Sequence, residues 1–360
     1  MTIYMRKRFL ALDVLRGLTM MLMIIVNNPG DYECVFPALR HSSWDGCTLC
    51  DLVFPFFLFC VGVSMAFSLA RYDGPSSDAL RKILKRGAVM YLIGVAISAF
   101  PFYSPQHAMD LESIRLTSVL SRIALCYVFG SFIVLWLRKP LRIVLSIAIL
   151  CILHVTLLLV FAGPEGAFTL EGNFARRFDI AIFGESHIYQ GYGLPFDPEG
   201  LVGVLTGTCT ALLGYLTGLI VRDGVSKAVL LRLSVFAVLS LASGLILNIW
   251  VPINKPLWSV SYVFYAGGWA ILALAATAYM TDVKGWEKPF LPFRIMGMNA
   301  IAIYIFAEVV IRAVWHYTDW NPAVLFGADE MMSMLFGVLY VSVNLGVATI
   351  LYKKRIFIRL

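Results

Sequence analysis

Long apolar segments alternate with short polar ones along almost the whole chain. Each apolar segment approaches the roughly 20 residues that an α-helix needs to cross a bilayer. The pattern predicts ten such segments, at about 9–28, 51–70, 87–103, 117–137, 141–162, 201–221, 229–250, 258–280, 291–313 and 331–352. We therefore expect an all-α, polytopic membrane helix bundle with about ten transmembrane helices, built as a single domain over residues 1–360.

Composition agrees with a membrane protein. Hydrophobic residues make up 60% of the chain and charged residues 14%, and the mean hydropathy is +0.81. Soluble domains have about 45–50% apolar and about 25% charged residues. The net charge of +7 does not call for a nucleic-acid partner, because Lys and Arg collect in the cytoplasmic loops of membrane proteins. The first apolar segment is long enough to span the bilayer and shows no signal-peptide cleavage site, so we expect it to be retained.

Basic residues orient the bundle. Most of the 29 Lys and Arg residues lie in the two tails and in every second connection. The positive-inside rule then places both termini in the cytoplasm and predicts an even number of spans. Segments 29–50 and 163–200 fall on the outer side. The second is long enough to act as a lid or a binding loop.

The outer segment around His41 carries the strongest chemical pattern, because a polar loop runs directly into an apolar helix at Asp51. An imidazole titrates near neutral pH, so it can take a proton from an amine or carry an acyl group. Asn27 ends the first span and Asp51 begins the second, so we expect both at the same membrane level. The alternatives are a solvated loop histidine at position 41 and helix caps at positions 27 and 51. His187 is a second candidate acid–base residue.

Other polar residues stand inside or beside the spans. Arg122 lies within the fourth span, where ionisable residues usually face a polar cavity, and we expect it to bind phosphate or carbonyl oxygens. Arg16 either pairs with Asp13 at spacing i, i+3 or extends to lipid headgroups. The carboxylates of Glu199 and Glu308 are either helix-end features or ligands. The cysteines show no metal pattern, and a disulfide on the outer side stays open among Cys34, Cys47 and Cys50.

With these residues identified, the chain resembles the heparan-alpha-glucosaminide N-acetyltransferase family, specifically its transmembrane domain. The matching stretches occur in family order over nearly the whole chain. They are Leu12-Asp13-Val14-Leu15-Arg16-Gly17, Val26-Asn27, His41 to Thr48, Asp51-Leu52-Val53-Phe54-Pro55, Asp197-Pro198-Glu199-Gly200, Pro252-Ile253-Asn254-Lys255, Leu257-Trp258-Ser259, Ser261-Tyr262 and Gly297-Met298-Asn299.

The resemblance implies a metal-free membrane acetyltransferase that moves the acetyl group of cytosolic acetyl-CoA to the amine of an amino sugar on the outer side. It implies a homodimer as well. The implied catalytic residues are His41, Asn27 and Asp51. The implied donor-binding residues are Arg122, Arg16, Asn27 and Asn299. For the acceptor sugar we expect Trp44, Asp45, Glu199, Asn254, Lys255 and Glu308.

Three departures from the family pattern modify this expectation. The loop from Asn27 to His41 is longer here, and Ala307 stands where animal members have a histidine. The first span begins close to Met1, which suggests a bacterial inner-membrane form acting on a cell-envelope or foraged amino sugar. Two rival functions remain: an O-acyltransferase of envelope glycans, and a sugar or anion transporter. Transporters often contain broken helices and repeats, and the sequence shows neither clearly.

Overall fold

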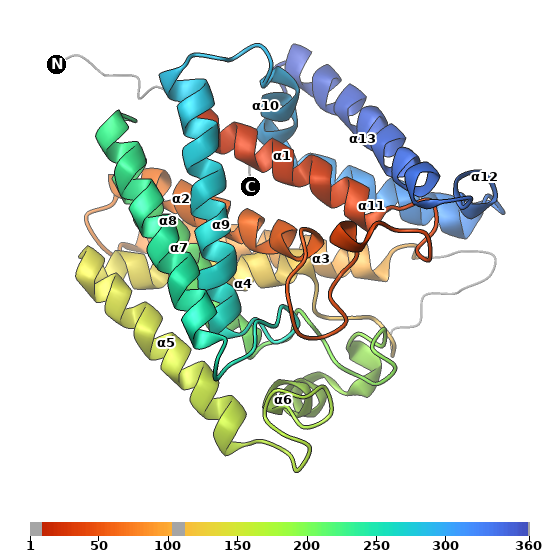
Figure 1. The fold of residues 1–360 in the computed structure, drawn as a ribbon, viewed down its shortest axis with the longest axis horizontal. Helices are drawn as coiled ribbons and strands as arrows, with labels where there is room; N and C mark the ends of the chain where they lie inside the picture. Colours follow the sequence, from red (N-terminus) through yellow and green to blue (C-terminus); the bar gives the residue numbers. More distant parts are fainter. Residues whose placement is uncertain (1–8, 103–111, 359–360) are drawn as a thin grey trace.

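The computed structural model describes residues 9–102 and 112–358, and its regular structure there is helical (Figure 1). The helices are α1 (Leu10–Asn27), α2 (Val53–Ser68), α3 (Ser77–Ala99), α4 (Val119–Leu137), α5 (Pro140–Val160), α6 (Phe174–Phe183), α7 (Gly203–Val221), α8 (Lys227–Leu247), α9 (Val260–Ala278), α10 (Leu291–Met298), α11 (Ala300–Tyr317), α12 (Ala323–Phe326) and α13 (Glu330–Lys353). One isolated β-bridge joins Gly46 to Asn254. The expected all-α polytopic bundle is confirmed.

Nine helices within the described residues are long and apolar enough to cross a membrane. The expected span 87–103 falls outside this set. It corresponds to α3, which begins earlier, at Ser77, and carries charged side chains through its first turns. The expected end at 103 lies outside the described residues, as do Arg6, Lys7, Arg8 and Arg359 of the basic tails.

The expected span 291–313 is two helices. The chain breaks at Asn299, between α10 and α11. The Asn299 amide donates to the carbonyl of Ile356 at 3.0 Å, and its oxygen accepts from the backbone N–H of Ile358 at 3.0 Å. The break is therefore held by the C-terminal segment. A broken helix is one of the features that the sequence did not reveal.

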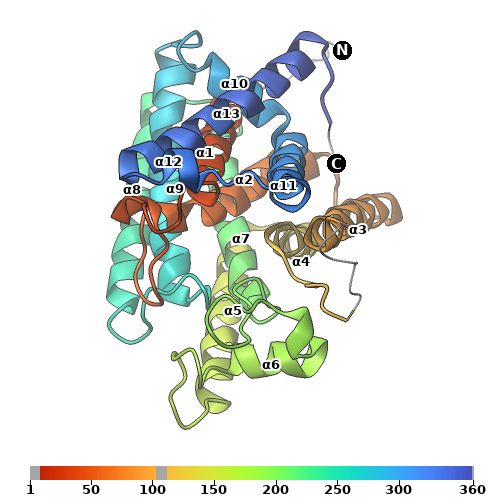
Figure 2. The same ribbon diagram turned by 90° about the vertical axis from the view of Figure 1, so that its right-hand side faces the viewer.

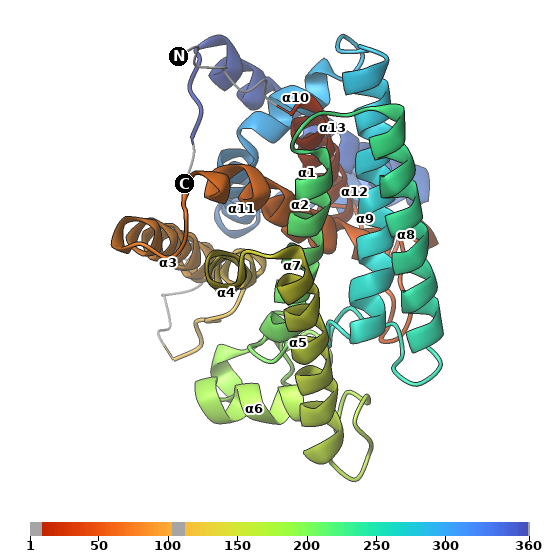
Figure 3. The same cartoon turned by 90° about the vertical axis from the view of Figure 1, so that its left-hand side faces the viewer.

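Helix α7 occupies the centre of the bundle. Figures 2 and 3 show α3 and α4 on one side of it and α8 and α9 on the other. Small residues let α7 approach α2: a Cβ added to Gly62 would lie 1.8 Å from the carbonyl oxygen of Ala211. Such small-residue contacts are the usual way for membrane helices to pack closely.

Hydrogen bonds between distant segments define two ends of the bundle. At one end, the chain after α1 meets the start of α13, where the Gly30 N–H donates to the Ser333 carbonyl at 3.0 Å. At the opposite end, the Ala11 N–H donates to the Asp282 carboxylate at 3.1 Å. Since α1 begins and α13 ends at the same end, the chain crosses the bundle an even number of times. This agrees with the charge pattern.

Candidate active site

The loop between α1 and α2 places His41 against the start of α2. Its Nδ1 lies 2.7 Å from Oδ1 of Asp51. The Asp51 side chain is 1% exposed and the His41 side chain 54% exposed. The carboxylate is thus enclosed, whereas the imidazole reaches the surface. The structure thus brings together two of the three residues expected to be catalytic, His41 and Asp51.

Donors from the same loop hold the Asp51 carboxylate. Its Oδ2 accepts from the backbone N–H groups of Ser42 and Thr48, both at 3.1 Å, and from their hydroxyls at 3.0 and 3.2 Å. Hydrogen bonds to the charged form stabilise a carboxylate. Asp51 is therefore a fixed anion that orients the His41 ring. The sequence analysis gave no role to Ser42 or Thr48.

A second loop, between α8 and α9, brings Lys255 to this pair. Its Nζ lies 3.0 Å from His41 Nδ1 and 3.3 Å from Asp51 Oδ1. The neighbouring Asn254 donates to the side chain of Asp45 at 3.0 Å and to the carbonyl of Trp44 at 3.2 Å. Asn254 is fully buried. Asn254 and Asp45 thus join two loops although they are 209 residues apart in sequence.

Aromatic side chains fix Trp44 beneath the long outer loop. Its Nε1 donates to the Phe168 carbonyl at 2.7 Å, and its ring meets Phe196 and Tyr192 edge to face at 5.2 and 5.9 Å. Burial raises the pKa of Tyr192, and the charges of Glu199 and Asp51 add to this effect. The long loop therefore faces the same region as the His41 pair.

The carboxylates expected to bind the acceptor are paired with arginines. Arg115 donates to Asp197 at 2.7 and 2.9 Å and also to Glu199. Burial opposes the ionised form of Asp197, but the hydrogen bonds and charge of Arg115 hold its pKa below the usual value. On α11, Glu308 lies 3.5 Å from Arg312. Neither Glu199 nor Glu308 contacts His41.

Arg122 lies inside the protein. It is 1% exposed, donates to the carbonyl of Gly200 at 2.6 Å, and stacks over the Trp258 ring at 5.3 Å. Arg122 therefore ties α4 to the start of α7 and to the loop before α9. Asn27, at the end of α1, keeps an exposed side chain. Its backbone carbonyl accepts from the Tyr32 hydroxyl at 2.9 Å.

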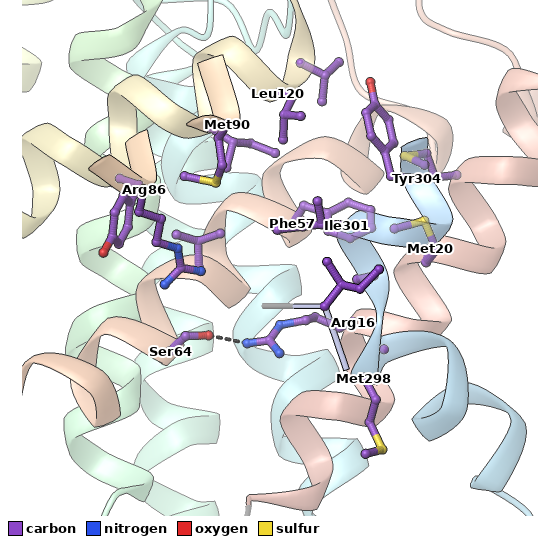
Figure 4. A pocket seen from close by; sticks show the side chains of 18 of the residues that line it. Arg16, Met20, Phe57, Ser64, Arg86, Met90, Leu120, Met298, Ile301 and Tyr304 are labelled. Carbon is purple, nitrogen blue, oxygen red and sulfur yellow. Dashed lines mark hydrogen bonds between the residues drawn. The ribbon is translucent and has the colours of Figure 1, made fainter. Parts of the chain in front are cut away.

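A cavity of about 330 Å³ is lined by residues of α1, α2, α3, α4, α10 and α11 (Figure 4). Arg16 and Arg86 project into it, and Arg16 donates to the Ser64 hydroxyl. Most of the remaining lining is apolar, and five methionines belong to it: Met20, Met23, Met65, Met90 and Met298.

A second cavity, of about 370 Å³, shares Ser68, Arg86 and Tyr127 with the first. It is basic, and its cations are Arg71, Lys82, Lys85 and Arg86. The two spaces together join a cationic surface to a narrow apolar interior. The sequence analysis expected Arg16 to bind the donor and gave no role to Arg86, because the basic residues of this segment were expected in a cytoplasmic loop.

Sequence comparisons relate the chain to known proteins. A profile described as "Heparan-alpha-glucosaminide N-acetyltransferase, catalytic" matches residues 8–169. The mouse (Mus musculus) heparan-alpha-glucosaminide N-acetyltransferase is 28% identical over 97% of this chain, and the human (Homo sapiens) protein is 27% identical over 97%. The chain is therefore similar to this family, to its catalytic profile over residues 8–169 and to both relatives over nearly its whole length.

The chain spans 60% and 59% of the lengths of these two relatives. The matched range 8–169 of the heparan-alpha-glucosaminide N-acetyltransferase profile contains His41 and Asp51 as well as Arg16 and Arg86. Lys255 lies beyond that range. Within the described residues, the fold therefore adds Lys255 to the His41 pair.

Proposed function

We propose that the protein is a membrane-embedded acetyltransferase that moves the acetyl group of acetyl-CoA to the amine of a glucosamine-like sugar. The observation that carries this proposal is the His41–Asp51 pair, an exposed imidazole fixed by a buried carboxylate. A base that a third group orients is the arrangement that activates nucleophiles in acyl transfer. The similarity to the heparan-alpha-glucosaminide N-acetyltransferase family supports the same reaction class.

The two cavities suit the donor. Acetyl-CoA carries several phosphates on a nucleotide and a long, narrow arm that ends in the thioester. The basic cavity with Lys82 and Lys85 matches the phosphates, and the apolar cavity matches the arm. The apolar cavity extends from Arg16 to Met23, which is about 10 Å along α1 at 1.5 Å per residue. Met23 lies one turn before Asn27, so the arm would approach the end of α1 where the His41 loop begins.

The chemistry follows from this arrangement. The amine nitrogen attacks the thioester carbonyl while His41 takes the amine proton at Nε2, and the Asn27 amide stabilises the developing oxyanion. The C–N bond forms, the C–S bond breaks, and the imidazolium returns its proton to the leaving CoA thiolate. In the second route, His41 itself accepts the acetyl group and passes it to the amine. Both routes use the same pair. In either route Arg122 supports the site by fixing α4 to α7.

The acceptor region lies under the long outer loop. Trp44 supplies an apolar face for a sugar ring, and Glu199 and Glu308 supply negative charge for an ammonium group. We assign Asp45 and Asn254 the role of shaping this region, since they hold its two loops together. A homodimer in a bacterial inner membrane belongs to the same proposal, and native mass spectrometry of the solubilised protein tests the dimer.

The broken helix at Asn299 favours a second candidate, a sugar or anion transporter. Interrupted helices commonly line transport sites, and Gly297, Met298 and Ala300 around this break line the apolar cavity. A transporter needs no acyl donor. Substrate uptake into proteoliposomes without acetyl-CoA is the observation that would favour it.

Acetyl transfer from radiolabelled acetyl-CoA to glucosamine tests the main proposal, with wild type compared with His41→Ala and His187→Ala. His187 lies on the same side, but its Nδ1 contacts the Ile114 carbonyl at 2.8 Å. We expect His41→Ala to lose about 100-fold or more of the rate, the size of a general-base effect, and to keep CoA binding. His187→Ala should stay active. Transfer at the wild-type rate by His41→Ala would falsify the assignment. Transfer to a hydroxyl only would identify an O-acyltransferase.

A further inference from the structure

Three groups surround one nitrogen of His41. Nδ1 lies 2.7 Å from Asp51 Oδ1, 3.0 Å from Lys255 Nζ and 3.2 Å from Cys50 Sγ. Asp51 and Lys255 are themselves 3.3 Å apart. The Nδ1 edge of the ring is therefore enclosed by these groups, while the side chain as a whole keeps an exposure of 54%.

The sulfur of Cys50 does not share the plane of the ring. It lies 3.2 Å from Nδ1 and 3.6 Å from Nε2. At these nearly equal distances, an in-plane sulfur would overlap the ring carbons, so the thiol lies over the ring face. Neither in-plane lone pair of His41 points at it. Asp51 and Lys255 are left as the groups that act on Nδ1.

The charges on these two groups oppose each other. Asp51 accepts four hydrogen bonds from Ser42 and Thr48, so it stays an anion. An anion 2.7 Å away favours the imidazolium form, which has no lone pair to accept a proton. The Lys255 cation favours the neutral ring. Coulomb energies at such distances are substantial even in a mostly aqueous setting.

We propose that Lys255 is a positioning residue that keeps His41 neutral, with its proton on Nδ1 facing Asp51 and its lone pair on Nε2 facing the acceptor. This rests on the proposed function for its catalytic meaning. After Nε2 takes a proton from the amine, the adjacent Lys255 cation also promotes transfer of that proton to the leaving thiolate. Lys255 thus acts through His41 rather than on the sugar.

Three further ionisable groups near the pair, Cys47, Cys50 and Tyr192, are neutral at working pH. Burial raises the pKa of Cys47 to about 12, and the negative charge of Asp51 adds to it. The pKa of Tyr192, across the site, is raised by burial and by Glu199. The Cys50 thiol is buried, 2% exposed. Among the three groups that contact Nδ1 of His41, the charged ones are therefore Asp51 and Lys255.

Diethyl pyrocarbonate tests this without any substrate. A neutral imidazole nitrogen attacks the reagent and becomes ethoxycarbonylated, and ethanol and carbon dioxide are released. Mass spectrometry of the His41 peptide between pH 5 and 8 gives the pH at half-maximal modification. His187, in the same sample, is the internal control.

We expect Lys255→Gln and Lys255→Met to raise the half-modification pH of His41 by about one unit and to leave His187 unchanged. Lys255→Arg keeps the cation and should keep the midpoint. Asp51→Asn should lower it. An unchanged midpoint in folded Lys255→Gln and Lys255→Met overturns the inference.

The acid limb of kcat/KM for acetyl transfer should move with the modification midpoint. A purely structural role for Lys255 would lower the rate without moving that limb, which contradicts the inference. If wild type modifies as expected but transfers no acetyl group to any acceptor, the proposed function fails while the effect of Lys255 on His41 stands.

Discussion

At the residue scale, the site depends on which charges are paired. Six atoms lie within hydrogen-bond or ion-pair distance of the Asp51 carboxylate. Five belong to His41, Ser42 and Thr48 of its own loop, and the sixth is Nζ of Lys255. Asp197 has Arg115. Breaking either buried pair would leave an uncompensated charge, which typically costs about 3–5 kcal/mol. These carboxylates are therefore structural anchors for the two outer loops.

Asp179, on α6, contrasts with them. It is fully buried, and only its Oδ1 accepts a hydrogen bond, from the Leu201 N–H at 2.9 Å. Burial raises its pKa to about 7, and the nearby Asp197 contributes to this. The folded protein thus binds this proton more tightly than the unfolded chain, in which an aspartate titrates near pH 4.

Stability should therefore fall as pH rises from about 4 to 7 through this residue, and level off above. The Asp179→Asn variant lacks this contribution to the pH dependence of stability. From pH 5 to pH 8 the unfolding free energy of both proteins falls. We expect the fall in Asp179→Asn to be smaller than the fall in wild type by on the order of 3 kcal/mol. Tryptophan-fluorescence melting curves in detergent measure this. Asp78→Asn, at an exposed position, is the control. Parallel pH dependences for Asp179→Asn and wild type would contradict the assignment.

At the element scale, glycines set the distances between the central helices. Gly214 on α7 faces the backbone of α2, and a Cβ there would lie 2.1 Å from the carbonyl oxygen of Phe59. On α1, a Cβ at Gly17 would lie 1.7 Å from the Phe293 carbonyl oxygen of α10. Backbone atoms cannot move aside as side chains do, so these contacts fix the helix positions.

Gly214→Ala should force α7 away from α2 and destabilise the protein by about 1–3 kcal/mol, the usual cost of overpacking. Gly346→Ala on α13 is the matched control, because nothing lies within 4 Å of its added Cβ. That variant should be neutral or slightly stabilised, since alanine favours helix over glycine by roughly 1 kcal/mol. Equal melting temperatures for both variants would mean that α2 and α7 do not pack this closely.

At the scale of the whole molecule, the proposed function depends on the apolar cavity that residues of α1, α2, α3, α4, α10 and α11 line. Ile123 of α4 lines this cavity. Ile149 of α5 is 63% exposed on the outside of the bundle. The two residues therefore allow the same substitution to be made inside and outside the predicted donor path.

Ile123→Trp should fill the cavity and weaken acetyl-CoA binding by roughly tenfold or more, a loss of about 1.4 kcal/mol or greater. Ile149→Trp should bind like wild type. Calorimetric titration in detergent measures both affinities. Undiminished binding to a folded Ile123→Trp protein would place the donor elsewhere.

The sequence by itself determined the membrane class and the even crossing pattern, and it singled out His41 and Asp51 as candidate site residues. Apolar length and basic alternation are local properties, because the bilayer imposes them on each helix separately. Asp51 follows His41 by ten residues on one short loop, so its contact with His41 needed little tertiary information. The motif from His41 to Asp51 also carried the family resemblance, which the comparisons confirm.

Only the tertiary structure decided where the other polar residues act. Lys255 reaches His41 across more than 200 residues, through a loop pairing that no periodicity encodes. Arg122 donates to the backbone carbonyl of Gly200, and Arg86 lines the cavity from α3. The break at Asn299 depends on a bond to the C-terminal segment. Such contacts arise from packing between distant segments, and packing is settled by the whole bundle rather than by the local pattern of residues.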